Sequence, residues 1–152
     1  MTTTEPAAKP FRNMPPPPPS FIGSLIDERT RPFWDAAKRE QLVAPKCSNC
    51  GTFRMPPSRF CTNCLSMDLE YEPLAGTGTV FTFIIVRHPL NPMAADYVPF
   101  MPAAIDADGA PGMRFISNVV DCEPEDVHVG MKVKVVWHPV SDTLTLPYWA
   151  PA

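Results

Sequence analysis

Four of the five cysteines form a C-x2-C-x10-C-x2-C array, which is made up of Cys47, Cys50, Cys61 and Cys64. Two intervening residues let both sulfurs of a pair face one point from a tight turn, and the longer spacer allows a short hairpin that brings the two turns together. Four converging thiolates match the tetrahedral preference of Zn²⁺. Because the protein supplies all four ligands, no coordination position stays open for water, and we expect a structural zinc ion. Two disulfides or free buried thiols are the alternatives.

The chain has 152 residues and a net charge of −3. That length allows one medium domain, or a small metal module attached to a somewhat larger core. The acidic balance disfavours a broad nucleic-acid surface, because neutralising phosphates takes clustered Lys and Arg. The sequence shows neither the pattern of a signal peptide nor an apolar run of about 18 residues. We therefore expect a cytoplasmic protein without a membrane segment, in a reducing compartment where thiols bind metal.

Proline is the compositional outlier, with 21 residues. A flexible proline-rich arm is predicted at the start of the chain, where the run from Pro15 to Pro19 favours a polyproline II rod. This rod is either a ligand for a proline-reading groove or a stiff arm that lies across a partner or stays mobile. A lone proline run carries little specificity, which favours the second interpretation.

A helix is predicted from Ser24 to Leu42, with a break near Pro32. Thr30 can cap its second part, and the missing N–H of Pro32 does no harm in the first turn. Phe33 and Trp34 lie on a short apolar stripe, which needs something to pack against. We expect either burial against this chain or docking on another protein.

From Leu69 onward, short stretches rich in β-branched and aromatic residues alternate with Gly, Pro and Asp turns. In the stretch 79–86 both faces are apolar, so we expect it to be covered on both sides. In the stretch 131–138, apolar residues alternate with Lys132 and Lys134. About five strands without intervening helices predict a small OB-like barrel, with a small β-sandwich as the alternative. The five predicted strands are 79–86, 99–106, 113–120, 131–138 and 144–149, and the stretch 69–74 leads into the bend at Gly76-Thr77-Gly78.

The predicted fold is therefore mainly β, with an N-terminal helix and a zinc ribbon followed by a five-stranded OB-like barrel. A ribbon this small cannot fold on apolar burial alone, so the metal must supply much of its stability. The predicted domains are the proline-rich arm (1–20), the helical segment (21–44), the zinc ribbon (45–70) and the barrel (71–152).

Outside the array, few residues suggest catalysis. Cys122 and His128 could form a nucleophile–base pair, but nothing places a third, orienting group beside them. A small, half-buried thiol after a strand is the commoner role for such a cysteine. The remaining histidines are His88, at a strand end where exposure is expected, and His138. We expect no catalytic residues in this chain, and a cysteine-dependent enzyme is the alternative.

Several short motifs follow one another along the chain. They are Phe33-Trp34, the four cysteines, Gly76-Thr77-Gly78-Thr79-Val80-Phe81-Thr82-Phe83, Asn118-Val119-Val120-Asp121, Gly130-Met131-Lys132-Val133 and Leu146-Pro147-Tyr148-Trp149. With them the chain resembles the rubredoxin-like zinc-ribbon/OB-fold family of acyl-CoA-associated proteins. The resemblance covers about residues 32–151, and the order and spacing of the motifs are more specific than any one of them.

The resemblance implies a non-catalytic subunit that binds a thiolase-like protein, as a heterotetramer, with acyl-CoA at the shared interface. The partner would supply the catalytic residues for thiolysis or aldol cleavage of an aromatic, steroid or fatty acyl-CoA. The apolar segment 89–102 could form the wall of an acyl channel or fold onto its own barrel. Arg87 could bind a CoA phosphate or a partner carboxylate, or stay solvated. The predicted acyl-CoA or partner contacts are Phe33, Trp34, Arg87, Tyr97, Phe100 and Met101.

An OB-like barrel also allows binding of single-stranded nucleic acid, with Phe81, Phe83, Tyr97 or Trp137 as stacking platforms. That function needs a basic groove beside the aromatics. The barrel region carries few basic residues among many acidic ones. Nucleic-acid binding is therefore the alternative function, and we expect no nucleic-acid partner.

Overall fold

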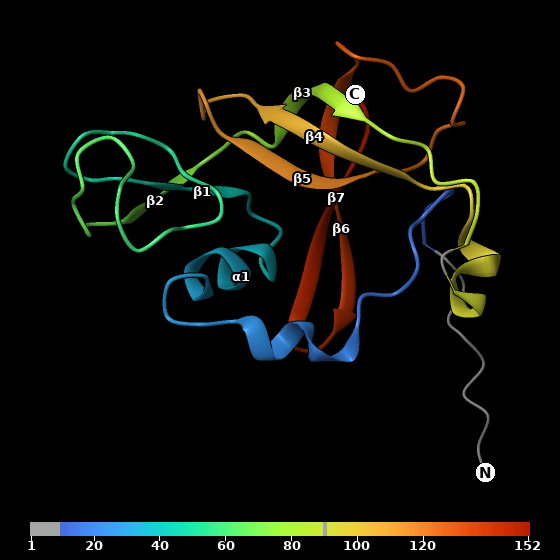
Figure 1. Cartoon of the computed structure of the whole chain (residues 1–152), viewed down its shortest axis with the longest axis horizontal. Coiled ribbons are helices and arrows are strands. Elements are labelled where there is room, and N and C mark those ends of the chain that lie inside the picture. The colour runs from blue at the N-terminus through green and yellow to red at the C-terminus, as the bar shows by residue number, and fades with distance from the viewer. Residues whose placement is uncertain (1–9, 90) are drawn as a thin grey trace.

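The computed structural model describes residues 10–89 and 91–152. A zinc ribbon lies on one side of a β-barrel, and the helix α1 lies next to the ribbon, against the barrel (Figure 1). Among the described residues, no helix has the length and apolar character needed to cross a membrane. The elements in chain order are η1 (Ser20–Leu25), α1 (Arg31–Ala37), β1 (Val43–Lys46), β2 (Glu70–Pro73), β3 (Thr77–Phe83), η2 (Pro92–Tyr97), β4 (Met101–Ala107), β5 (Arg114–Val119), β6 (Lys132–Ser141) and β7 (Leu144–Pro151).

The barrel closes in the order β3-β4-β5-β7-β6, and β6 pairs back onto β3. All its strand pairs are antiparallel except β5 with β7, which meet at Val119 and Trp149. Side chains from all five strands fill the interior, because alternate residues of each strand point inward. The prediction of a mainly β fold with a five-stranded barrel is confirmed, and the sandwich alternative is wrong. The fully buried interior residues include Val80, Ile105, Val119, Val133 and Trp149.

Two strands show where alternation predicts burial and where it does not. In β6, Val133 is fully buried while Lys132 and Lys134 are exposed, as predicted. In β3, the register with β4 shifts between Val80 and Thr82, so Phe81 is an extra residue in a β-bulge. Phe81 is 46% exposed, and the expectation that both faces of this stretch are covered is therefore wrong.

The predicted helix from Ser24 to Leu42 is wrong in its length. Only α1 is α-helical, and a 3₁₀-helix, η1, precedes it. Asp27 ends the first part, because its Oδ1 accepts hydrogen bonds from the backbone N–H groups of Arg29 (2.9 Å) and Thr30 (2.8 Å). The Thr30 hydroxyl also hydrogen-bonds within this turn and does not cap α1. Pro32 does lie in the first turn, and Glu40 ends the region with a φ of 57°.

The described part of the proline-rich arm lies against the barrel rather than away from it. The Arg12 N–H donates to Asp121 Oδ1 (2.8 Å), and the Asp121 N–H donates to the Arg12 carbonyl (2.9 Å). The Met14 side chain is 5% exposed and packs with Val120 and Tyr148 in a second hydrophobic cluster. Apolar side chains before the proline run thus hold the arm against the barrel of its own chain. The first nine residues of the predicted flexible arm lie outside the described part of the chain.

Candidate metal centre and an adjoining groove

Two short turns, or knuckles, present the four cysteines. In the first, the Cys47 N–H donates to the Thr52 carbonyl (2.9 Å) and the Gly51 N–H donates to the Cys47 carbonyl (2.8 Å). Each knuckle needs a positive φ just after its second cysteine, and Gly51 supplies it at 76°. Cys47 directly follows β1, whose pairing with β2 fixes both ends of the ribbon. The local sequence therefore folds each C-x2-C pair into one half of a metal site.

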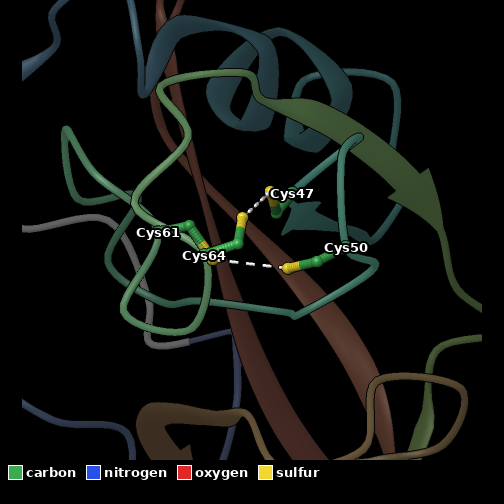
Figure 2. Close-up of side chains that lie close together, drawn as sticks. All are labelled: Cys47, Cys50, Cys61 and Cys64. Carbon is green, nitrogen blue, oxygen red and sulfur yellow. Dashed lines mark hydrogen bonds between the residues drawn. The ribbon is translucent and has the colours of Figure 1, made fainter.

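The four sulfur atoms lie within 4.8 Å of one another (Figure 2). Across the two knuckles, the Sγ atoms of Cys47 and Cys64 are 3.6 Å apart, and so are those of Cys50 and Cys61. A tetrahedral zinc ion with ordinary Zn–S bonds requires sulfurs about 3.8 Å apart. The donor set and its spacing therefore fit a zinc ion, and these four cysteines are positioned to hold it.

Local hydrogen bonds favour the thiolate form at two of the four sulfurs. The Thr52 side chain and backbone lower the pKa of Cys50 to about 5. The backbone N–H groups of Cys64 and Asn63 lower the pKa of Cys61. Burial instead raises the pKa of Cys47. A dication at the centre would offset that burial, because metal ligation deprotonates a thiol outright.

A groove of about 530 Å³ lies beside the ribbon on the outer face of the barrel. Its walls come from the proline-rich arm, α1, the loop between the cysteine pairs, β5 and β7, and they are mostly apolar or aromatic. One side chain in it, Ile116, is 79% exposed. Asn118 also lines the groove, and its Oδ1 is buried without a hydrogen-bond partner among the described residues. The most prominent lining residues are Pro18, Trp34, Pro56, Ile116, Asn118 and Tyr148.

Two of the six predicted contact residues lie at this groove. Phe33 and Trp34 line it, with ring centroids 5.1 Å apart in an edge-to-face arrangement. Phe33 is only 6% exposed, because it stacks on Phe115 in the main core. Trp34 is partly buried and offers more of its surface. The interpretation of this stripe as self-buried therefore holds for Phe33, whereas contact through Trp34 stays a prediction.

The other four predicted contacts lie outside the groove, on and next to the segment that includes η2. Arg87 is exposed and forms an ion pair with Glu125, at 2.9 Å between Nη2 and Oε1. Phe100 forms an isolated antiparallel bridge with Val86, and Tyr97 packs on the second hydrophobic cluster. Met101 has no exposed surface and belongs to the barrel core, because it is the first residue of β4. The six residues thus do not form one cluster.

Sequence reasoning did not find Asn118 or the arm prolines as groove residues. Asn118 lies in a stretch that also holds Arg114 and Ser117, and the other walls of the groove come from separate elements: the arm, α1, the loop between the cysteine pairs and β7. No local pattern marks it. The arm prolines did stand out by composition, but their position against β5 and β7 depends on the docking of Met14.

The residues suggested for catalysis do not form a pair. Cys122 is 5% exposed, and burial raises the pKa of its thiol. His128 is exposed, and its Nδ1 lies 2.8 Å from the Asp126 carbonyl oxygen. Within residues 10–89 and 91–152, no hydrogen bond joins Cys122 to His128. A neutral, buried thiol without a base is a poor nucleophile.

The aromatics suggested as nucleic-acid stacking platforms are not presented together. Phe81 is covered on one face by the Arg114 guanidinium, whose central carbon lies 3.5 Å from the ring centroid. Arg114 also pairs with Asp106, at 2.9 Å between Nε and Oδ1. Phe83 and Trp137 are partly buried and pack against the main core. This arrangement gives a nucleic-acid groove no support.

Comparison with known proteins agrees with this architecture. Residues 34–70 match the family model described as "ChsH2, rubredoxin-like zinc ribbon domain", and residues 71–138 match "ChsH2, C-terminal OB-fold domain". The chain belongs to the DUF35 family. A "DUF35 domain-containing scaffold protein" of Methanocaldococcus jannaschii is 32% identical over 120 residues, which cover 78% of this chain and 83% of that protein.

Two further relatives carry more specific names. The "Probable enoyl-CoA hydratase alpha subunit" of Thermomonospora curvata is 36% identical over 125 residues, which is 82% of this chain but 38% of that protein. Most of that relative therefore lies outside the match. In solved structures, a chain of the "Ltp2-ChsH2(DUF35) aldolase" is 32% identical with a TM-score of 0.73, covering 84% of this chain and 97% of that chain.

Proposed function

We propose that this chain is a non-catalytic accessory subunit that binds a thiolase-like partner and helps form its acyl-CoA site, in cleavage of a carbon–carbon bond. The observation that carries the proposal is the match to the ChsH2(DUF35) chain, 97% of which is covered at 32% identity. That chain belongs to an aldolase whose name joins two components. The scaffold name of the archaeal relative supports a role in assembly.

The groove beside the ribbon supports a contact with the acyl group. Its volume of about 530 Å³ falls in the range of pockets for small organic molecules. Apolar and aromatic walls suit a bulky hydrocarbon group. The aromatic, steroid or fatty acyl groups implied by the resemblance all meet this description.

A division of labour between two chains follows from what this chain holds. Cys122 is the one cysteine outside the metal array, burial raises the pKa of its thiol, and among the described residues no hydrogen bond joins it to His128. The metal ligands are four cysteines, so the ion has a structural role and offers no open position to a substrate. We therefore assign the acid, base and nucleophile to the partner. Thiolate ligation also favours a reducing compartment, such as the cytoplasm.

Co-expression with a thiolase-like protein from the same genome tests the proposal. We expect the two to co-purify as a heterotetramer and the partner alone to lose most of its acyl-CoA turnover. Titration with this chain should restore turnover to a plateau at equimolar ratio. Full activity of the partner alone, or failure of the two proteins to associate, would contradict the proposal. Turnover of acyl-CoA by this chain alone, abolished in C122S, would favour an enzyme instead.

A further inference from the structure

The two metal knuckles have the same backbone conformation, but a different residue follows the second cysteine in each. In the second knuckle, the Cys61 N–H donates to the Ser66 carbonyl (2.8 Å) and the Leu65 N–H donates to the Cys61 carbonyl (3.0 Å). These bonds repeat those of the first knuckle. The residue after the second cysteine is Gly51 in one knuckle and Leu65 in the other, with φ values of 76° and 61°. A leucine in this left-handed conformation is strained, whereas glycine is not.

Burial within this chain does not offset that strain. The Leu65 side chain is 75% exposed, and two apolar neighbours along the chain, Phe60 and Met67, are 51% and 49% exposed. The hydrogen bond from Cys61 to Ser66 holds their two segments side by side. Neither hydrophobic cluster of the described residues includes any of the three. A strained, mostly exposed leucine that belongs to neither hydrophobic cluster points to a contact outside its own fold.

A cation borders this apolar surface. The Arg59 guanidinium lies over the Phe60 ring, 5.8 Å from its centroid, and the residue is exposed. In the described part of the chain Arg59 forms no ion pair. Aromatic, methionine and arginine side chains are the residues that protein interfaces prefer. An exposed arginine beside them matches a carboxylate on the other side of the contact.

We propose that Arg59, Phe60, Leu65 and Met67, here called the knuckle patch, are a docking surface for the thiolase-like partner. The partner would present an apolar pocket that receives Leu65 and a carboxylate that pairs with Arg59. This inference rests on the proposed function, and it assigns the contact to the ribbon rather than to the groove or to segment 89–102. The metal fixes the patch in advance, so binding loses little conformational entropy.

Leu65→Gly tests the assignment, because relief of strain should keep or raise the stability of the isolated chain, whereas loss of the contact should weaken its affinity for the partner. In the isolated chain, L65G should keep one metal ion and melt at the same or a higher temperature than wild type. Its affinity for the partner, measured by titration calorimetry, should weaken about tenfold or more, as expected for loss of a central anchor. Arg59→Glu should weaken binding as well, and its effect should shrink at high salt.

Two control variants separate strain from contact. Gly51→Leu places a leucine at the equivalent position of the other knuckle, where a new Cβ would have only Lys46 Cε nearby, at 3.9 Å. G51L should lower the melting temperature. Val129→Ala removes a 65% exposed side chain of the barrel and should leave both stability and affinity unchanged.

The outcomes distinguish this inference from the proposed function. Binding of wild type, L65G and R59E with equal affinity would overturn the docking surface and leave the accessory function standing. Failure of wild type to bind any thiolase-like partner would overturn both. If L65G loses metal or melts earlier, the strain argument is wrong, and Phe60→Ala then decides: unchanged affinity overturns the patch, and weakened affinity at unchanged stability supports it.

Discussion

The ribbon and the barrel are joined in one short chain, yet different physical forces hold them. In the barrel, five strands enclose fully buried side chains such as Val80, Ile105 and Trp149. By contrast, the ribbon segment that follows β1 and precedes β2 along the chain makes one isolated β-bridge, from Phe53 to Lys46. Within residues 47–69, the fully buried side chains are those of two metal ligands, Cys47 and Cys61. Apolar burial therefore specifies the barrel, whereas four sulfur atoms around one point specify the ribbon.

This difference teaches where each region tolerates change. In a barrel core, the loss of stability grows with the size of the side chain that is removed, because many small contacts contribute to the stability. A metal site responds in an all-or-none way, because each ligand is one of four. The ribbon can consequently expose apolar residues such as Leu65 that a small apolar core would need for itself.

Removal of the metal should have the largest effect, and it should affect the ribbon but not the barrel. Chelation, or Cys47→Ser, should unfold the ribbon, because structural zinc contributes about 10 kcal/mol or more in small metal modules. Hydrogen exchange should then rise at residues 47–66 and stay slow in β4 and β5. Cys122→Ser is the matched control, since it removes a buried thiol outside the array and should keep one metal ion per chain. Slow exchange throughout the metal-free ribbon would contradict the structural role of the metal.

A cut in the barrel core should have the next largest effect. Trp149 is fully buried and packs at 6.2 Å from Phe115 between ring centroids. Trp149→Ala should lower the free energy of unfolding by about 3–5 kcal/mol, as large-to-small changes in cores do. Ile116→Ala, at a 79% exposed position, should change it by less than about 0.5 kcal/mol. Denaturant titration measures both, and equal effects of the two variants would show that the barrel interior is not the stabilising core.

Sequence alone predicted the features that depend on local spacing. The cysteine array identified all four sulfurs that the structure brings within 4.8 Å, because a C-x2-C turn places its two ligands without help from the rest of the fold. Alternation placed the strands of the barrel, since one buried face leaves a pattern of period two. The inward position of Val133 follows from that pattern directly.

Features that depend on distant partners escaped prediction. The bulge at Phe81 depends on the register of β3 against β4, which the sequence of one strand does not reveal. The apolar stretch was therefore predicted to be covered on both faces. The arm was predicted to be flexible from its proline run alone, whereas Phe11 and Met14 pack with Val120 and Tyr148 in the structure. The helix was predicted too long because Asp27 and Thr30 form a local turn that interrupts it.

The arm offers a test of intermediate size, because a small second hydrophobic cluster joins it to the barrel. Met14 is 5% exposed in the second cluster, and Met14→Ala should lower the free energy of unfolding by about 2 kcal/mol. Limited proteolysis should then cut the arm faster than the barrel. Pro17→Ala, at an exposed position of the same run, is the control and should leave the cleavage rate unchanged. Equal cleavage in wild type and M14A would show that Met14 does not anchor the arm.

The smallest expected effect concerns His138, where arm and barrel meet. Its ring stacks on Tyr148, at 5.8 Å between centroids, and lies edge-on to Phe11 at 6.4 Å. Burial lowers the pKa of His138 below its ordinary value of 6.5, so the folded state binds this proton less readily than the unfolded state. The contribution is complete above pH 6.5 and is lost as the pH falls through the lowered pKa.

Acidification from pH 7.5 to 5 should therefore destabilise wild type more than His138→Phe, which keeps the ring stack and cannot titrate. We expect a difference below about 1 kcal/mol, because the side chain is only partly buried. Urea titrations across this pH range, with the metal content checked at each point, measure it. The difference should appear also in M14A but shrink there, since loss of the anchor admits water to the ring. If the free energy of unfolding depended on pH identically in wild type and H138F, protonation of His138 would not oppose the docking of the arm.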